Sequence, residues 1–268
     1  MDILQYDFMR RAFLVGLMLA VIVPCIGVVV VLKRLSMLGD ALSHTSLAGV
    51  AAGLVLGINP IVGAVVMCVI SALSIEAIRK KLPKYAEMAI AITMSAGVGL
   101  AGVLSGFVKS AANFNSFLFG SIVAISDFEM LLVCLISLAV MLAFVLLYKE
   151  LFYIALDERA ARLAGVPVRT VNFIFTILTA ITVSVAARTV GALIVSSLMV
   201  LPVACAMQVS RSYKQTVFVS VLFGLFFIIG GLFLSYYAGL KPGGTIVLMG
   251  VASLILLLLG KGALGRRA

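Results

Sequence analysis

Stretches of about 20 mostly apolar residues, the length that a transmembrane helix needs, follow one another along nearly the whole chain. Only short polar segments separate them, and none is long enough to form a separate soluble domain. Of the 268 residues, 64% are hydrophobic and 11% are charged. Soluble domains carry about a quarter charged residues. The sequence therefore predicts an all-α, polytopic membrane protein with a single transmembrane domain over residues 1–268.

Nine membrane spans fit the apolar stretches. The first stretch leads directly into another and lacks a small-residue cleavage site, so we expect a retained helix and not a signal peptide. The predicted spans lie near residues 12–32, 35–57, 60–78, 88–108, 128–148, 171–187, 191–210, 215–237 and 243–260.

The charges between the spans predict the orientation of the chain. With the N-terminus outside, 15 of the 20 Lys and Arg residues fall on the cytoplasmic side. This excess follows the positive-inside rule, and nine spans then leave the C-terminus in the cytoplasm. Because the distribution of charge explains the net charge of +10, we expect the lipid bilayer, and no nucleic acid, as a partner.

An ionisable pair interrupts the second predicted span. In the segment LSMLGDALSHTSLAGVAAGLVLG (35–57), Asp40 and His44, the only histidine, lie four residues apart and so share one helix face. Carboxylate and imidazole are good ligands for zinc or manganese, and intramembrane ionisable groups usually face an ion path or a partner. The alternative is a hydrogen-bonded pair that ties helices together.

The longest loop on the predicted cytoplasmic side covers residues 149–170. Its sequence is compatible with a short helix from Leu156 to Leu163. Asp157 and Glu158 suit the N-terminal end, where the helix dipole favours anions, and Gly165 suits a C-terminal cap. This helix is either a solvated linker or a docking site for a cytoplasmic partner.

Small residues recur every four positions within two spans. Gly49, Gly53 and Gly57 form one series, and Gly102 and Gly106 form another. Such faces let helices approach closely, either within one chain or between two copies.

No catalytic signature was found: the sequence has no Walker loop, no GxSxG and no HExxH. We therefore expect that the chain is not an enzyme, and that any ATP hydrolysis comes from a separate subunit.

Several segments, in this order along nearly the full chain, resemble the membrane permease subunits of bacterial ATP-binding-cassette importers for zinc, manganese and iron. They are SMLGDALSH (36–44), FGSIVAIS (119–126), LDERAARLAGVPVRT (156–170), VGALIVSSLMVLPVACA (190–206) and LSYYAGLKPGGTIVL (234–248). The opening YDFMRRAF and the segment GVPVRT most resemble zinc-uptake permeases of Gram-positive bacteria.

The resemblance implies a multi-pass protein of the bacterial plasma membrane that acts as a homodimer or heterodimer. It also implies two kinds of partner, cytoplasmic ATPase subunits and an extracellular metal-binding protein. The transported ion would be a divalent metal, with Zn²⁺ favoured over Mn²⁺ and iron, and no cofactor would be bound permanently. The interior loop would be the coupling loop, and its contacts with the ATPase would be Asp157, Glu158, Ala161 and Gly165.

The same resemblance favours the metal path for Asp40 and His44. Two permeases would supply two carboxylates and two imidazoles, enough for transient four-coordination of Zn²⁺. Ser43 and Ser46 are candidates for further oxygen or water contacts on this path. Arg188, at the outer end of the sixth predicted span, is a candidate gate or a surface anchor.

Two other classes of function stay open on the sequence alone. A stand-alone secondary transporter would use Asp40 and His44 as a proton relay. An intramembrane enzyme would use them as acid and base, although no further acid–base cluster accompanies them.

Overall fold

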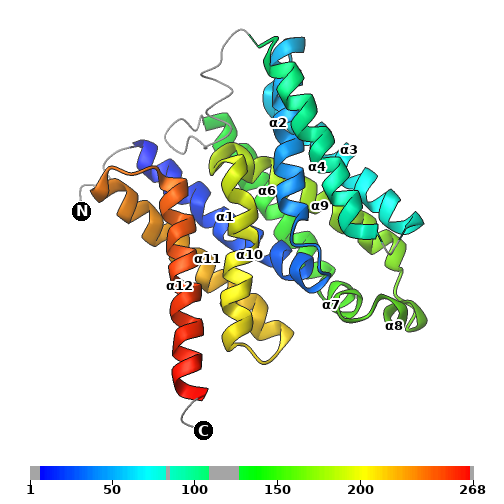
Figure 1. Cartoon of the computed structure of the whole chain (residues 1–268), viewed down its shortest axis with the longest axis vertical. Helices are drawn as coiled ribbons and strands as arrows, with labels where there is room; N and C mark the ends of the chain where they lie inside the picture. The colour runs from blue at the N-terminus through cyan, green and yellow to red at the C-terminus, as the bar shows by residue number, and fades with distance from the viewer. Residues whose placement is uncertain (1–6, 83–84, 109–126, 266–268) are drawn as a thin grey trace.

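The described residues form α-helices joined by turns (Figure 1). The computed structural model describes residues 7–82, 85–108 and 127–265, so the segment FGSIVAIS (119–126) lies outside the described residues. The helices are α1 (Asp7–Leu32), α2 (Leu38–Leu56), α3 (Pro60–Lys81), α4 (Ala86–Ser105), α6 (Asp127–Leu146), α7 (Tyr148–Leu156), α8 (Glu158–Leu163), α9 (Val168–Thr189), α10 (Ala192–Val209), α11 (Tyr213–Ala238) and α12 (Pro242–Gly265).

Each of the nine predicted spans coincides with one long helix. Within the described ranges, seven of these helices are long and apolar enough to cross a membrane: α1, α3, α4, α6, α9, α11 and α12. Helix α10 has 18 residues and carries Ser196, Ser197 and Pro202, and α2 carries Asp40, His44 and several hydroxyls. The chain is therefore a multi-pass membrane protein, whereas the number of nine spans and their orientation stay predictions.

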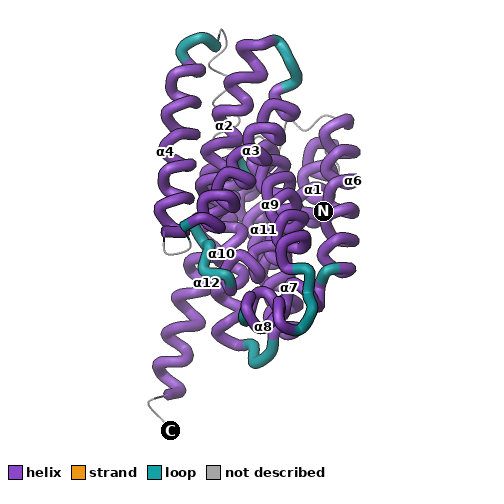
Figure 2. Tube along the Cα trace, turned by 90° about the vertical axis from the view of Figure 1, so that its right-hand side faces the viewer, coloured by secondary structure: helices purple, strands orange, loops and turns teal. Residues whose placement is uncertain are grey.

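Helices α1 and α9 lie at the centre of the bundle. They are the most buried of the seven apolar helices. In their most apolar 18-residue segments, 72% of α1 and 67% of α9 is buried. Helices α2, α3 and α4 pack together as one group, and α10, α11 and α12 form a second group (Figures 1 and 2). Helix α10 also contacts α2, so the two groups meet along these two helices.

Glycines allow the closest helix contacts in the first group. A Cβ atom on Gly49 would lie 2.2 Å from the carbonyl oxygen of Gly63 in α3, and one on Gly53 would lie 3.0 Å from Pro60. Gly57 ends α2 with a φ of 71°, a conformation that glycine adopts at low cost. The first glycine series therefore serves packing within the chain. A Cβ on Gly102 would have no neighbour within 4 Å.

The predicted helix from Leu156 to Leu163 is wrong in its extent. Residues 148–156 already form α7, and a break at Asp157 separates it from α8. The cause is local, because Asp157 has an extended backbone (φ −154°, ψ 109°) and its side chain caps α8.

Two ends of the molecule differ in their charged residues. We define the α8 end as the turns after α1, α3, α7 and α10 together with α8. Shared cavities join these turns: one is lined by Lys33, Arg79 and Glu158, and another by Leu156 and Arg211. The start of α1, the end of α9 and the turn between α11 and α12 lie at the opposite end (Figure 1). The cation-rich segments thus gather at the α8 end.

Candidate metal path and coupling segment

Asp40 and His44 lie one turn apart near the start of α2. The Nε2 atom of His44 is 3.8 Å from Oδ1 of Asp40, and 25% and 29% of the two side chains are exposed. Both groups are thus partly enclosed by protein and partly accessible. The i,i+4 pairing expected from the sequence is confirmed.

Asp40 lines a cavity of about 350 Å³ between α2, α10 and α12. Ser36 and Met37 lie beside it, and Ser196 and Ser197 of α10 lie across the cavity. Gly39 explains this proximity, because its Cα faces α10 closely: a Cβ there would lie 3.5 Å from Cα of Ser196. The only sequence signal of this serine pair is two adjacent hydroxyls inside an apolar stretch, which does not indicate a site.

Ser43 and Ser46 lie on the buried side of α2. Their exposed fractions are 1% and 2%. The hydroxyl of Ser43 donates a hydrogen bond to the carbonyl oxygen of Gly39 (2.8 Å). The Cys68 thiol donates to the carbonyl oxygen of Leu42 on the same side of α2 (3.2 Å). Neither serine lines the cavity beside Asp40. Their place on a metal path stays a prediction, and their contacts are those of helix-packing residues.

One chain supplies two strong metal ligands at this position. Among the described residues, no group of three or more His, Cys, Asp and Glu side chains is placed to hold a metal ion. Since structural zinc sites use four ligands, Asp40 and His44 make half of such a set. A complete ligand set needs a second copy, a hydroxyl or water.

The ends of α8 are defined by its own sequence. The carboxylate of Asp157 accepts hydrogen bonds from the backbone N–H groups of Arg159 (2.8 Å) and Ala160 (3.1 Å). At the other end, Gly165 has a φ of 85°, and the N–H groups of residues 165 and 166 donate to the carbonyls of residues 162 and 161. This is a Schellman motif, so the C-terminal cap predicted at Gly165 is confirmed. Asp157, expected near the N-terminal end because of the helix dipole, is the N-cap itself.

Two apolar side chains of α8 have opposite environments. Ala161, a predicted contact residue, is 2% exposed and packs in the core, whereas Leu163 is 90% exposed. Glu158 is partly exposed and forms an ion pair of 3.4 Å with Arg162. The exposure of Leu163 could not be predicted from the sequence, because it depends on how α8 packs on α7 and α9.

Arg188 joins α9 to α6. Its Nη2 and Nε atoms lie 2.9 Å and 3.0 Å from Oε1 of Glu129, and only 20% and 14% of the two side chains are exposed. A second pair, Arg11 with Asp127 (2.7 Å), joins α1 to the same first turn of α6. Arg188 is therefore an interhelical contact, which is compatible with a gate as well as with an anchor.

The sequence profile of the ABC 3 transport family matches residues 5–261. A "Probable metal transport system membrane protein" of Treponema pallidum is 34% identical over 257 residues, which covers 95% of this chain and 96% of that protein. The "Manganese transport system membrane protein MntC" of Listeria innocua is 30% identical, with 92% and 88% coverage. The "High-affinity zinc uptake system membrane protein ZnuB" of Haemophilus influenzae is 27% identical, with 91% and 94% coverage.

A solved structure gives the same fold. The complex "PsaBC from Streptococcus pneumoniae in complex with Fab" contains a chain that matches with a TM-score of 0.86 and 27% identity. The match covers 96% of this chain and 92% of that chain, so the arrangement of helices described above is shared along nearly the full length.

Proposed function

Because this chain belongs to the ABC 3 transport family, we propose that it is the membrane permease subunit of an ATP-driven importer of divalent metal ions. Relatives named as membrane proteins of metal transport systems support the class of function. The observation that carries the proposal is the Asp40–His44 pair in a membrane protein, with Asp40 lining a cavity. An ionisable pair in that position is costly and usually marks an ion path. In this proposal, residues 1–268 act as one permease domain.

The pair works best when two permeases face each other. Two Asp40 carboxylates and two His44 imidazoles offer four ligands to a passing Zn²⁺ ion, and the carboxylates offset its charge. The site must stay weak, because an ion that binds too tightly does not leave. The hydroxyls of Ser196 and Ser197 offer oxygen contacts along the same cavity. Ser43 and Ser46 support this face of α2 from the buried side.

Zn²⁺ is the proposed cargo, and Mn²⁺ is the second candidate. An imidazole ligand suits Zn²⁺ better than Mn²⁺, for which oxygen ligands are preferred. The Listeria innocua protein named for manganese (30% identity) is at least as similar to this chain as the Haemophilus influenzae protein named for zinc (27%), which is the reason to test both ions together.

Coupling to ATP hydrolysis is proposed to use α7 and α8, within residues 149–170. A separate cytoplasmic ATPase would bind the surface formed by Asp157, Glu158 and Leu163, whereas Ala161 and Gly165 fix the position and the end of α8. An extracellular metal-binding protein would deliver the ion at the opposite end, where the Arg188–Glu129 pair holds α9 against α6.

The experiment uses cells that lack their own metal importers and express the complete transporter in chelator-limited medium. Zinc, manganese and iron contents are measured together for wild type, His44→Ala and Asp40→Asn. Because substitutions that only reorient a metal ligand already lower affinity about 10- to 100-fold, loss of a ligand should lower zinc uptake at least about tenfold. Asp7→Asn, which removes an exposed carboxylate at the start of α1, is the matched control.

Three outcomes separate the alternatives. Normal uptake by normally inserted His44→Ala and Asp40→Asn proteins would show that the pair is off the metal path. A manganese deficit in place of a zinc deficit would identify the second cargo. Loss of uptake on addition of a proton ionophore, with ATP held high, would favour a proton-coupled secondary transporter.

A further inference from the structure

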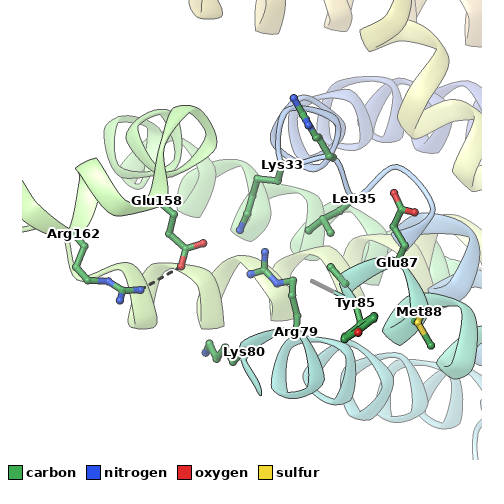
Figure 3. A pocket seen from close by; sticks show the side chains of 11 residues that line it. Lys33, Leu35, Arg79, Lys80, Tyr85, Glu87, Met88, Glu158 and Arg162 are labelled. Atoms are coloured by element: carbon green, nitrogen blue, oxygen red, sulfur yellow. Dashed lines mark hydrogen bonds and ion pairs between the residues drawn. The ribbon is translucent and has the colours of Figure 1, made fainter. Parts of the chain in front are cut away.

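A cavity of about 920 Å³ opens at the α8 end, between the ends of α1 and α3, the start of α4, and α8 (Figure 3). Figure 3 shows Lys33 and Arg79 extending into this space from opposite sides, with Glu158 and Arg162 at its margin. Two acidic side chains, Glu87 and Glu158, line it. Five cationic side chains line it: Lys33, Arg34, Arg79, Lys80 and Arg162.

Ion pairs within the chain neutralise only some of these five cationic side chains. Glu76 pairs with Arg79 (2.7 Å) and Lys80 (3.4 Å). Glu158 pairs with Arg162. Over residues 7–82, 85–108 and 127–265, neither Lys33 nor Arg34 forms an ion pair with a carboxylate. The positive surplus therefore lies on the α1 side of the cavity.

Lys33 has no carboxylate within ion-pair distance, although Glu76 and Glu158 lie close enough to favour its charged form. Its ammonium group donates a hydrogen bond to the neutral amide oxygen of Asn172 (2.8 Å) and lies 5.7 Å from the ring centre of Phe175. Burial, together with nearby Arg79, lowers the pKa of Lys33 to about 8. An anion in the cavity would stabilise the charged form.

Arg34 is an unusual residue beside it. It is the only non-glycine residue with a positive φ (58°) in the described part of the chain, and its side chain lines both this cavity and a neighbouring one of about 290 Å³. Such backbone conformations are costly and persist where the surrounding structure requires them.

The cavity lies where membrane helices end. Lys33 follows α1, Arg79 and Lys80 are in the last turn of α3, and Tyr85 precedes α4. About half of the Tyr85 and Met88 side chains is exposed, and the exposed apolar surface continues along α4 with Ile92. Cations and a tyrosine at the level of helix ends, with apolar surface next to them, are typical of the phospholipid headgroup region.

We propose that this cavity binds the phosphate group of an anionic phospholipid, with Lys33 and Arg34 as the main contacts and the acyl chains along α4. This site needs only the membrane location of the chain and is independent of the transported metal. Its effect on transport rests on the proposed function, because Glu158 and Arg162 belong to α8. A phosphate near Arg162 would compete with Glu158 and shift α8, and so change its coupling to the ATPase.

Binding is tested on the purified full-length permease with its ATPase. Native mass spectrometry measures the retention of phosphatidylglycerol and of phosphatidylcholine by wild type, by the double variant Lys33→Gln/Arg34→Gln and by Arg34→Gln alone, which changes only an exposed side chain. Loss of two cations should weaken phosphatidylglycerol binding about 30-fold and leave phosphatidylcholine unchanged. The matched control is Arg169→Gln/Lys214→Gln, which removes two exposed cations that do not line the cavity.

The outcomes distinguish the source of the phosphate. The proposal would be overturned if the folded Lys33→Gln/Arg34→Gln variant retained as much phosphatidylglycerol as the wild type. It would also be overturned if the Arg169→Gln/Lys214→Gln control lost as much phosphatidylglycerol as that variant. Inorganic phosphate and a sulfonate detergent of equal charge are then compared as competitors for the lipid bound to the wild type. Displacement by phosphate but not by the detergent would show that the phosphate group itself is recognised. ATPase rates in phosphatidylglycerol and phosphatidylcholine nanodiscs then report coupling separately, so a failure of the metal proposal leaves the binding result intact.

Discussion

At the scale of single residues, Leu163 is the side chain that α8 leaves most exposed. Because Leu163 is 90% exposed, folding of the chain buries almost none of its apolar surface. Ala161, two residues earlier, is buried in the core. Full burial of a leucine side chain is worth about 1.5–3 kcal/mol. Leu163 is therefore the residue of α8 with the most to gain from a protein partner.

We expect Leu163→Ala to weaken binding of the ATPase subunit to the purified permease about tenfold to a hundredfold, with unchanged thermal stability. Titration of the permease with labelled ATPase measures the effect. Leu240→Ala, which truncates a leucine exposed at the opposite end, should bind the ATPase like wild type. Equal affinity of the wild-type and Leu163→Ala proteins would place the ATPase contact elsewhere.

At the scale of elements, α8 depends on its caps because it has six residues and short helices are marginal by themselves. Replacing the Asp157 cap by alanine should cost about 1 kcal/mol of local stability and speed hydrogen exchange at residues 159–166. Asp157→Asn keeps a capping oxygen and should preserve protection from exchange. If Asp157→Asn nevertheless weakens ATPase binding, the carboxylate contacts the ATPase directly, whereas binding lost only in Asp157→Ala shows a structural role.

The close packing of α2 against α3 can also be tested with a single substitution. Gly49→Val would place a side chain against the backbone of Gly63, and overpacking of this kind costs about 1–3 kcal/mol. Gly102→Val makes the same change in helix propensity in α4, but its Cβ meets nothing within 4 Å. Thermal unfolding in detergent should show a lower melting temperature for Gly49→Val alone. Equal melting temperatures for the two variants would contradict this packing argument.

The elements also show which features the sequence could predict. Apolar length places the long helices within a few residues, and the cap residue places the end of α8 at Gly165, because both signals are local. The break between α7 and α8 was missed since residues 148–156 are compatible with a helix as well as with the end of a span. Ser196 and Ser197 beside Asp40 could not be predicted, because α2 and α10 meet only through tertiary packing.

At the scale of the whole molecule, the two ends differ in their charge. The cation-rich turns, α8 and the phosphate-binding cavity share one end, while the Arg188–Glu129 and Arg11–Asp127 pairs share the other. Positively charged segments are retained in the cytoplasm. The α8 end should therefore face the cytoplasm, which is also the only side on which an ATPase can reach α8.

We predict that an impermeant maleimide added to intact cells labels Leu240→Cys and leaves Lys214→Cys unlabelled, and that inside-out vesicles give the reverse. Both positions are exposed, at opposite ends of the molecule. The unsubstituted chain gives the background, since Cys25, Cys68 and Cys205 are buried and Cys134 is partly buried. The reverse labelling pattern would place α8 outside the cell. In that case α8 could not contact an ATPase.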